Sequence, residues 1–478
     1  MDHLLTLSGS ALAKKIREGE LTSAAVVEAH IRRIEQVNPI INAVAAPRFD
    51  QARAEARAAD LKTQRVPLKQ LPPFHGVPCT IKECFAVPGM PNTAGLVARI
   101  GLQVDTEAPA VARLRAAGAI LLGVTNLSEL CMWMESDNRV YGRTNNPYNP
   151  GRIVGGSSGG EGSIIGAGGS PFGLGSDIGG SIRMPAFFNG VFGHKPSAGL
   201  VPVAGQFPIA SNEARRYLTT GPLARRAEDL WPLLNILAGP DGEDKYCEAI
   251  KLGDPYHISF SKLKVVVIEN NGKVRVTRDM QNALRAVADR LVNLGVHVTT
   301  AKVEKLRYSR DIWSASLQAS GGPSFSELLG NGQPIDSFAE LGRWLWRKSD
   351  HTLPAIALTL LEKLNKLLPK RNRKFVEMGR ELRQELTELI GPDGVLLYPS
   401  YPSVAPPHYQ PLFHPFNFTY TAILNIMEFP VTQVPLGLNA QGLPLGVQVA
   451  AIHGHDHLTI GTALALEKEF GGWTPPEL

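Results

Sequence analysis

Two glycine-rich runs with serines inside them are the part of this sequence best suited to chemistry. They read Gly-Gly-Ser-Ser-Gly-Gly over 155–160 and Asp-Ile-Gly-Gly-Ser-Ile-Arg over 177–183. Glycine lets backbone N–H groups converge on an anion, because no Cβ blocks the approach. Acyl transfer needs a hydroxyl nucleophile beside such donors, which stabilise the oxyanion that forms when the nucleophile attacks a carbonyl. The two runs therefore indicate a site for acyl transfer.

Three other kinds of site fit the same glycines less well. A P-loop ends in Gly-Lys-Ser or Gly-Lys-Thr, and the glycine-rich block contains neither. Gly173, Gly175 and Gly179 do not have the spacing of a dinucleotide fingerprint. The run 155–159 matches the G-x-S-x-G nucleophile elbow formally, but the elbow needs a leading strand and the segment 152–154 is a poor one. The elbow also leaves the second run unexplained.

Lys82 is the candidate base for such a site. It follows a short apolar strand that begins near Gly76, and it precedes Phe85. A lysine in apolar surroundings loses its charged form more easily, so its pKa falls toward the range in which it can accept a proton. Taken alone, however, a lysine at the end of a strand is more often part of a surface ion pair, here with the adjacent Glu83.

These residues together resemble one known family. Lys82, Ser157 and Ser181, within their two glycine-rich runs, are similar to the corresponding residues of the amidase signature family. The likeness extends over nearly the whole chain, through further motifs at 143–147, 192–197 and 430–448. Within the family the chain is most similar to fatty-acid amide hydrolases of the second type, through the segments 126–133 and 184–190.

The resemblance implies both a fold and a mechanism. The fold would be α/β, the amidase signature fold, with a twisted mixed β-sheet core flanked by α-helices. Ser181 would be the nucleophile that forms an acyl-enzyme. Ser157, which follows a cis peptide bond in this family, would relay the proton to neutral Lys82 as the final base. Four backbone N–H groups would form the oxyanion hole, those of Ile178, Gly179, Gly180 and Ser181.

The resemblance also assigns supporting and binding roles. Three residues would hold the serine loops in place: Ser158, Asp177 and Arg183. Three more would belong to the wall of the substrate cleft: Cys131, Met132 and Trp133. The family requires neither a cofactor nor a metal, so we expect none.

The substrate class follows from the same likeness. We expect a serine amidase that hydrolyses the C–N bond of apolar amides, either fatty-acyl or aryl. A carbamate hydrolase (urethanase) or an esterase is the alternative, because the same attack serves any such carbonyl. A glutamine amidotransferase subunit acting on charged tRNA is a further rival. It would need a polar glutamine pocket and a partner subunit, and the apolar residues Met132, Trp133, Met134, Phe187 and Phe188 argue against it.

Other residues able to do chemistry have simpler explanations. The tract His-Gly-His-Asp-His over 453–457 alternates like a metal-binding strand, but it lies beyond the last family motif and is better explained as an exposed loop before a terminal helix. Cys79 and Cys84 flank Lys82 and are expected to pack as small apolar groups. His194 lies in a motif of the fold and is expected to be structural.

Alternating helices and strands must position the site. Apolar residues at helical spacing predict a helix after Thr22, which would cap it, and another over 280–291 that ends at Gly295 before the strand 297–300. A third step runs from the helix at 111–114 to a strand at 120–124. Such alternation predicts a mixed or largely parallel sheet with helices on both faces.

Composition limits the class of protein. The chain has 478 residues, 44% apolar and 19% charged, with a net charge of +5, which is too small to indicate a nucleic-acid partner. Four cysteines make no disulfide framework, which predicts a reduced, cytoplasmic protein. The first residues lack a signal peptide or membrane anchor, a departure from fatty-acid amide hydrolases of the second type. The longest apolar run, 353–361, is about half the roughly 20 residues of a membrane span.

We expect one domain over 1–478, with N-terminal helices in 1–70 and a catalytic core in 71–205. The segment 335–375 stands apart, because Trp344 and Trp346 precede the apolar run and a group of lysines and arginines follows it. Such a basic and apolar helical segment predicts either a lid or peripheral membrane contact through Trp344 to Lys374. A packed surface helix with a solvated basic face is the simpler alternative. The sequence leaves homodimer formation open.

Overall fold

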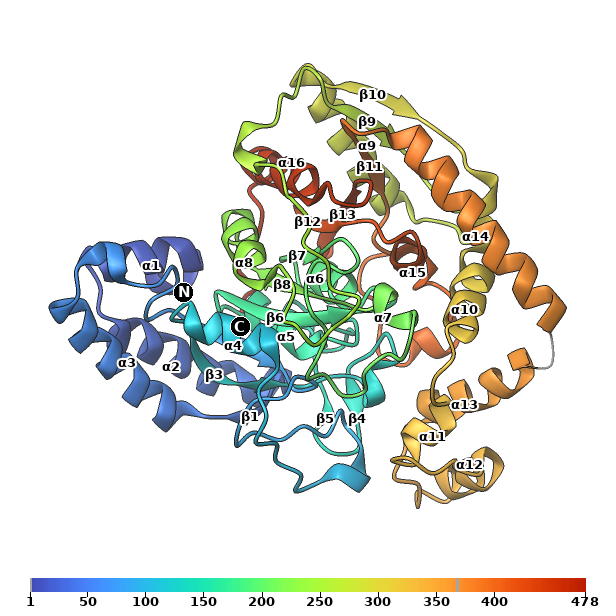
Figure 1. Ribbon diagram of the computed structural model, residues 1–478, viewed down its shortest axis with the longest axis horizontal. Helices are drawn as coiled ribbons and strands as arrows, with labels where there is room; N and C mark the ends of the chain where they lie inside the picture. The colour runs from blue at the N-terminus through green and yellow to red at the C-terminus, as the bar shows by residue number, and fades with distance from the viewer. Residues whose placement is uncertain (1, 367–368) are drawn as a thin grey trace.

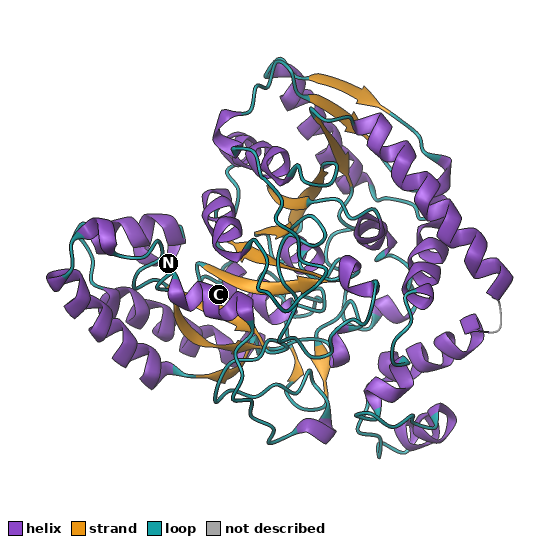
Figure 2. Ribbon diagram, in the orientation of Figure 1, coloured by secondary structure: helices purple, strands orange, loops and turns teal. Residues whose placement is uncertain are grey.

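A mixed sheet of eleven strands, flanked by helices, organises the chain (Figures 1 and 2). The computed structural model describes residues 2–366 and 369–478. The strand order is β1-β3-β2-β6-β8-β7-β12-β13-β11-β9-β10. Neighbours are parallel between β3, β2 and β6 and between β11, β9 and β10, and antiparallel elsewhere. The predicted α/β fold with a mixed sheet is confirmed.

The strands of the large sheet are β1 (Val44–Pro47), β2 (Pro78–Lys82), β3 (Ile120–Thr125), β6 (Phe172–Asp177), β7 (Phe192–Lys195), β8 (Thr219–Ala224), β9 (Lys264–Val267), β10 (His297–Thr300), β11 (Gly394–Tyr398), β12 (Val431–Leu438) and β13 (Pro444–Ala450). A separate pair consists of β4 (Asp137–Asn138) and β5 (Gly142–Arg143).

The helices are α1 (Gly9–Arg17), α2 (Ser23–Ile41), α3 (Phe49–Arg65), α4 (Pro109–Ala116), α5 (Gly159–Gly166), α6 (Arg183–Phe188), α7 (Ala214–Tyr217), α8 (Leu230–Leu237), α9 (Arg278–Asn293), α10 (Ser309–Ala319), α11 (Phe325–Leu329), α12 (Ser337–Leu345), α13 (Leu353–Lys366), α14 (Pro369–Ile390), α15 (Thr419–Ile426) and α16 (Asp456–Phe470).

The elements expected from sequence patterns form where the patterns place them. Thr22 caps α2 by accepting a hydrogen bond from the Ala25 N–H through its side chain. The apolar stripe of α9 is buried, and Gly295 (φ +81°) turns the chain into β10. The third predicted step gives α4 followed by β3.

Two parallel neighbours in the sheet bring the site together. In the register of β2 and β6, Thr80 lies opposite Gly173 and Ile81 opposite Leu174. Because parallel strands end at the same edge of a sheet, Lys82 at the end of β2 lies close to the end of β6. Both strands are buried along their whole length, as strands covered on both faces must be.

The segment 335–375 consists of α12, α13 and the first turns of α14, and in Figure 1 it projects from the lower right of the molecule. Residues 367 and 368 of this segment lie outside the described residues. Phe338, Leu345 and Trp346 on and just after α12 are 71%, 69% and 79% exposed. In the part of the chain that the structure describes, no helix is both long enough and apolar enough to cross a membrane.

Candidate active site

Lys82, Ser157 and Ser176 form a buried hydrogen-bonded group at the end of β2. Lys82 Nζ donates to Ser157 Oγ over 2.6 Å and to Ser176 Oγ over 3.0 Å. The side chains of Lys82 and Ser157 are inaccessible to solvent. The peptide bond between Gly156 and Ser157 is cis, the configuration that the family resemblance implied. The structure thus brings together two of the predicted catalytic residues and adds Ser176.

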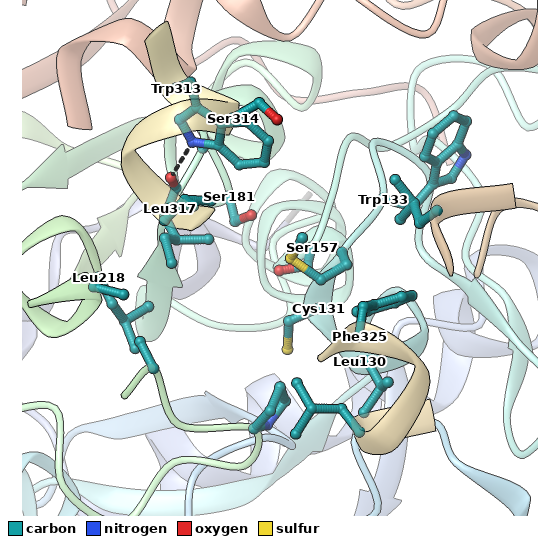
Figure 3. Close-up of a pocket in the computed structure, with 18 of the residues that line it drawn as sticks. Leu130, Cys131, Trp133, Ser157, Ser181, Leu218, Trp313, Ser314, Leu317 and Phe325 are labelled. Carbon is teal, nitrogen blue, oxygen red and sulfur yellow. Dashed lines mark hydrogen bonds between the residues drawn. The ribbon is translucent and has the colours of Figure 1, made fainter. Parts of the chain in front are cut away.

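Ser181 lies on the loop between β6 and α6, at the wall of a cavity of about 370 Å³ that Ser157 and Ser176 also line. Figure 3 shows both Ser157 and Ser181 facing this cavity. Their loops are tied to each other, because the Ser158 N–H donates to the Ser181 carbonyl over 3.2 Å. The Ser157 and Ser181 hydroxyls line one cavity without a hydrogen bond between them. Catalytic hydrogen bonds are often long before substrate binds.

Asp177 and Arg183 hold the Ser181 loop from beneath. Both side chains are fully buried and form a two-pronged ion pair, Nη2 to Oδ1 and Nε to Oδ2, each 3.0 Å. Asp177 also accepts the Gly180 and Ile182 N–H groups over 2.7 and 3.1 Å. Burial alone would raise the pKa of Asp177, but the Arg183 charge and hydrogen bonds hold it well below its usual range. This carboxylate therefore stays ionised and fixes the loop.

Arg183 links that loop to distant parts of the chain. Its guanidinium donates to Asn425 Oδ1 over 2.6 Å, to Gln448 Oε1 over 2.8 Å and to the Thr421 carbonyl over 2.9 Å. Asn425 and Thr421 belong to α15 and Gln448 to β13. The loop is thus anchored to the sheet and to a helix.

The four N–H groups expected in the oxyanion hole are not equally placed. The Gly180 N–H already donates to Asp177, so it is not free to bind an oxyanion. The N–H groups of Ile178, Gly179 and Ser181 have no acceptor among the described residues. These three residues also line the cavity. Three of the four expected donors are therefore available to a substrate.

The wall of the cavity is mainly apolar. Cys131, Met132 and Trp133, expected at the cleft wall, all line it. Its other large apolar side chains include Leu130, Met134, Met184, Leu218, Trp313, Leu317, Phe325, Leu328, Leu358, Leu361, Phe416 and Phe418. Leu358 and Leu361 come from α13, so the segment 335–375 contributes directly to the cavity.

Cys131 is a residue of this wall whose lowered pKa was not expected from the sequence. A hydrogen bond with Cys84 and the nearby charge of Lys82 lower the pKa of Cys131 to about 6. Cys84 is buried, and burial raises the pKa of its thiol well above the usual value. Cys131 and the preceding Leu130 both have left-handed backbone, with φ of +60° and +51°. Cys79 and Cys84 are buried among apolar side chains, as expected.

Glu83 does not form the surface ion pair considered for Lys82. Its carboxylate is buried and accepts the N–H and hydroxyl of Thr93 over 2.5 and 2.7 Å, the Ala94 N–H over 2.9 Å and the Tyr141 hydroxyl over 2.8 Å. Burial raises the pKa of Glu83 to about 7. The ion-pair alternative is therefore wrong.

A second carboxyl, Glu161, lies in the first turn of α5, beneath the serine loop. It accepts the Thr80 hydroxyl over 2.8 Å and the Thr125 hydroxyl over 2.9 Å. Burial raises its pKa to about 8, an effect that the charge of Lys82 opposes. Glu161 is therefore largely protonated at neutral pH and adds little negative charge near Lys82.

The histidines lie apart from the cavity. His194 Nδ1 bonds the Thr432 hydroxyl and its Nε2 bonds Asp456, in the structural role expected of it. The tract 453–457 precedes and starts α16, but it is half-buried rather than an exposed loop, because His453 bonds the Ala198 carbonyl and Asp456 is buried. Among the described residues, no three His, Cys, Asp or Glu side chains are grouped to hold a metal ion.

Two contacts of the site were missed by sequence reasoning. Ser176, the second acceptor for Lys82, stands beside Asp177 in the glycine-rich block, and that position was its only sequence signal. Trp313 of α10 donates its indole N–H to the Ile178 carbonyl over 2.9 Å and so supports the loop that carries the expected oxyanion donors (Figure 3). Nothing near Trp313 in the sequence points to this contact, because it comes from an element 135 residues away.

Comparison with known proteins identifies the family of this chain. Residues 25–460 match the amidase family. The chain therefore belongs to this family, whose members are the amidase signature enzymes, and it is an amide hydrolase. The chain is 48% identical over 490 residues to fatty-acid amide hydrolase 2-A of Danio rerio, covering 99% of this chain and 90% of that one. It is 47% identical over 489 residues to fatty-acid amide hydrolase 2 of Homo sapiens, with 99% and 91% covered. A solved 6-aminohexanoate cyclic dimer hydrolase in complex with substrate is similar in structure, with a TM-score of 0.83, 26% identity and 99% of both chains covered.

Proposed function

We propose that this protein hydrolyses apolar amides, fatty-acyl or aryl, through an acyl-enzyme formed on Ser181. The observation that carries the proposal is the juxtaposition of Lys82 and Ser157, 2.6 Å apart and buried, with Ser181 in one mainly apolar cavity. Relatives named fatty-acid amide hydrolase 2 support the same substrate class.

The proposed reaction uses these contacts in four steps. Ser181 Oγ attacks the amide carbonyl while its proton passes to Ser157, whose own proton passes to neutral Lys82. The N–H groups of Ile178, Gly179 and Ser181 stabilise the oxyanion, each contributing roughly 2.7–4 kcal/mol as single donors do in comparable sites. Lys82 then returns a proton through Ser157 to the leaving nitrogen. Water then attacks the acyl-enzyme carbonyl while its proton passes through Ser157 to Lys82. Lys82 returns a proton through Ser157 to Ser181 Oγ, and the carboxylic acid leaves.

Two other substrate classes are alternatives. Carbamates and esters present a carbonyl that the same nucleophile can attack, so a urethanase or esterase would use this site unchanged. A glutamine amidotransferase subunit would have to bind a polar side chain in this cavity. Met132, Trp133 and Met134 line it instead, which favours an apolar acyl group.

The substrate class is tested by a series of p-nitroanilides with acyl chains from acetyl to palmitoyl, with one aryl carbamate alongside. Each methylene buried against the cavity wall contributes up to about 0.8 kcal/mol, or about fourfold in kcat/KM. We expect kcat/KM to rise steeply with chain length. A flat or falling series with good carbamate turnover would identify a short-chain amidase or urethanase instead.

We further propose that the segment 335–375 acts as a lid or as a peripheral membrane contact. Three of its apolar side chains, Phe338, Leu345 and Trp346, are exposed at one end, and two others, Leu358 and Leu361, line the cavity. An apolar substrate could thus move from a membrane surface into the cavity without crossing water. A single domain over 1–478, a cytoplasmic location and a homodimer also stay predictions.

A further inference from the structure

One wall of the cavity runs the length of α10. Trp313, Leu317 and other side chains of this helix face the cavity, and Trp313 touches the oxyanion loop. Arg310 lies one turn before Trp313, at the start of α10, whereas Phe325 and Leu328 of α11 follow its end. Ten residues of helix are about 15 Å long, so Arg310 and α11 lie at opposite ends of this wall. Figure 1 shows α11 and α13 below α10.

The two ends of the cavity differ in their side chains. Among the described residues, the charged side chains that line it are those of Arg310 and Glu362. Glu362 lies at the α11 end, where its carboxylate accepts the Phe325 N–H over 2.8 Å. The α11 end therefore presents the apolar side chains of Phe325 and Leu328, while the Arg310 end presents a cationic side chain.

Arg310 has no carboxylate partner among the described residues, although it is half-buried. Its guanidinium stacks on the Phe416 ring, 3.9 Å from the ring centre. The adjacent Asp311 is paired with Arg371 of α14 over 3.3 Å, so Asp311 is already neutralised. Stacking fixes the plane of the guanidinium and leaves its N–H groups for another acceptor.

We propose that Arg310 binds a carboxylate or sulfonate on the amine part of the substrate, so that the preferred amides are N-acyl amino acids or similar acidic conjugates. This inference rests on the proposed function. The apolar acyl chain lies toward α11 and α13, and Ser181 is next to the oxyanion loop that Trp313 contacts. The leaving amine then points along α10 toward Arg310. An acidic group at the other end would face the apolar side chains of Phe325 and Leu328.

The proposal is tested with a matched pair, N-dodecanoylglycine and N-dodecanoylethanolamide, which differ mainly in charge. The ratio of their kcat/KM values is compared in the wild type and in Arg310→Gln. We expect the ratio to fall about tenfold to a hundredfold in favour of the neutral amide, which is what a charge-assisted hydrogen bond contributes. Arg310→Lys should restore part of it, and salt should lower it in the wild type.

Arg307→Gln is the control, because Arg307 is exposed and does not line the cavity, so its loss removes the same charge and should leave the ratio unchanged. An ω-carboxydodecanoyl ethanolamide places the acid on the acyl end and should gain nothing from Arg310. An unchanged ratio in Arg310→Gln would overturn the inference while fatty amides are still hydrolysed. If neither amide is hydrolysed, the proposed function fails, and the ratio of their Kd values decides the inference separately.

Discussion

At the scale of single residues, the proposed proton transfer depends on which oxygen atoms surround Lys82. Its side-chain nitrogen, Nζ, contacts two serine hydroxyls, and the nearby Glu83 and Glu161 carboxyls are bonded to other groups. Ser157 is therefore held by Lys82 on one side and faces the cavity with Ser181 on the other. In the proposed reaction a proton passes along this line without a histidine, which separates the site from a Ser-His-Asp hydrolase.

A prediction for a single residue concerns the alkylation of Cys131. Its thiol lines the cavity and its pKa is lowered to about 6, so the reactive thiolate is present above that pH. Iodoacetamide should inactivate the enzyme at a rate that rises from about pH 5 and levels off above pH 7, and an apolar amide should protect. The measurement is the pH dependence of the inactivation rate.

Two variants make the Cys131 experiment selective. Cys131→Ser should abolish the rapid inactivation, whereas Cys247→Ser should not change it, because Cys247 is buried and its pKa is raised to about 12. A rate that keeps rising through pH 9, as it does for an ordinary thiol, would show that the environment of Cys131 is not as described.

At the scale of elements, the Asp177–Arg183 pair joins the end of β6 to α6, α15 and β13. In Asp177→Asn the buried Arg183 loses its counter-charge. Leaving a buried charge unpaired costs about 3–5 kcal/mol. We expect the free energy of unfolding in urea at pH 7 to fall by that amount. Asp50→Asn is the matched control, since the Asp50 side chain is 96% exposed and its loss should change stability by less than about 0.5 kcal/mol.

The same ion pair predicts how the free energy of unfolding changes with pH. The pKa of Asp177 is lowered in the folded state, so its stabilisation is present above the unfolded value of about 3.9 and is lost as pH falls below it. The difference in stability between wild type and Asp177→Asn should therefore shrink in acid. A difference that stays constant from pH 7 to pH 3 would contradict a stabilising carboxylate.

Local patterns in the sequence predicted elements well but not contacts between them. The cap at Thr22 and the apolar stripe from Met280 to Leu291 each depend on neighbouring residues, and both α2 and α9 form as expected. The partners of Arg183 on α15 and β13 lie 242 and 265 residues away. No local spacing records such contacts, because they depend on which strands become neighbours in the sheet.

Only part of the candidate site could be predicted from the sequence, for a similar reason. The family resemblance supplied Lys82, Ser157 and Ser181, which the sheet brings to one place. It could not show that the Gly180 N–H is taken by Asp177, because that depends on the conformation of a loop with φ of +119° at Gly180. No pattern in the sequence marks Arg310, because its place in the cavity and its lack of an acidic partner are visible only in the folded chain.

At the scale of the whole molecule, the exposed apolar side chains of α12 predict binding to lipid. Wild type should co-sediment with vesicles that contain phosphatidylserine, because the basic residues that follow α13 add attraction to an anionic surface. Replacing Phe338, Leu345 and Trp346 by Ser should abolish co-sedimentation. Ile100→Ser, which removes an apolar side chain 61% exposed elsewhere, should have no effect. If wild type stays in the supernatant, the segment is a lid or a packed surface helix only.

The central claim is that Ser181 carries the acyl group. The most direct test is to quench the enzyme during turnover of a long-chain p-nitrophenyl ester and locate the added acyl mass by peptide mass spectrometry. We predict one acyl group on the peptide that contains Ser181, and none in a folded Ser181→Ala variant. An acyl group on Ser157 or Cys131, or an adduct that persists in Ser181→Ala, would contradict the account.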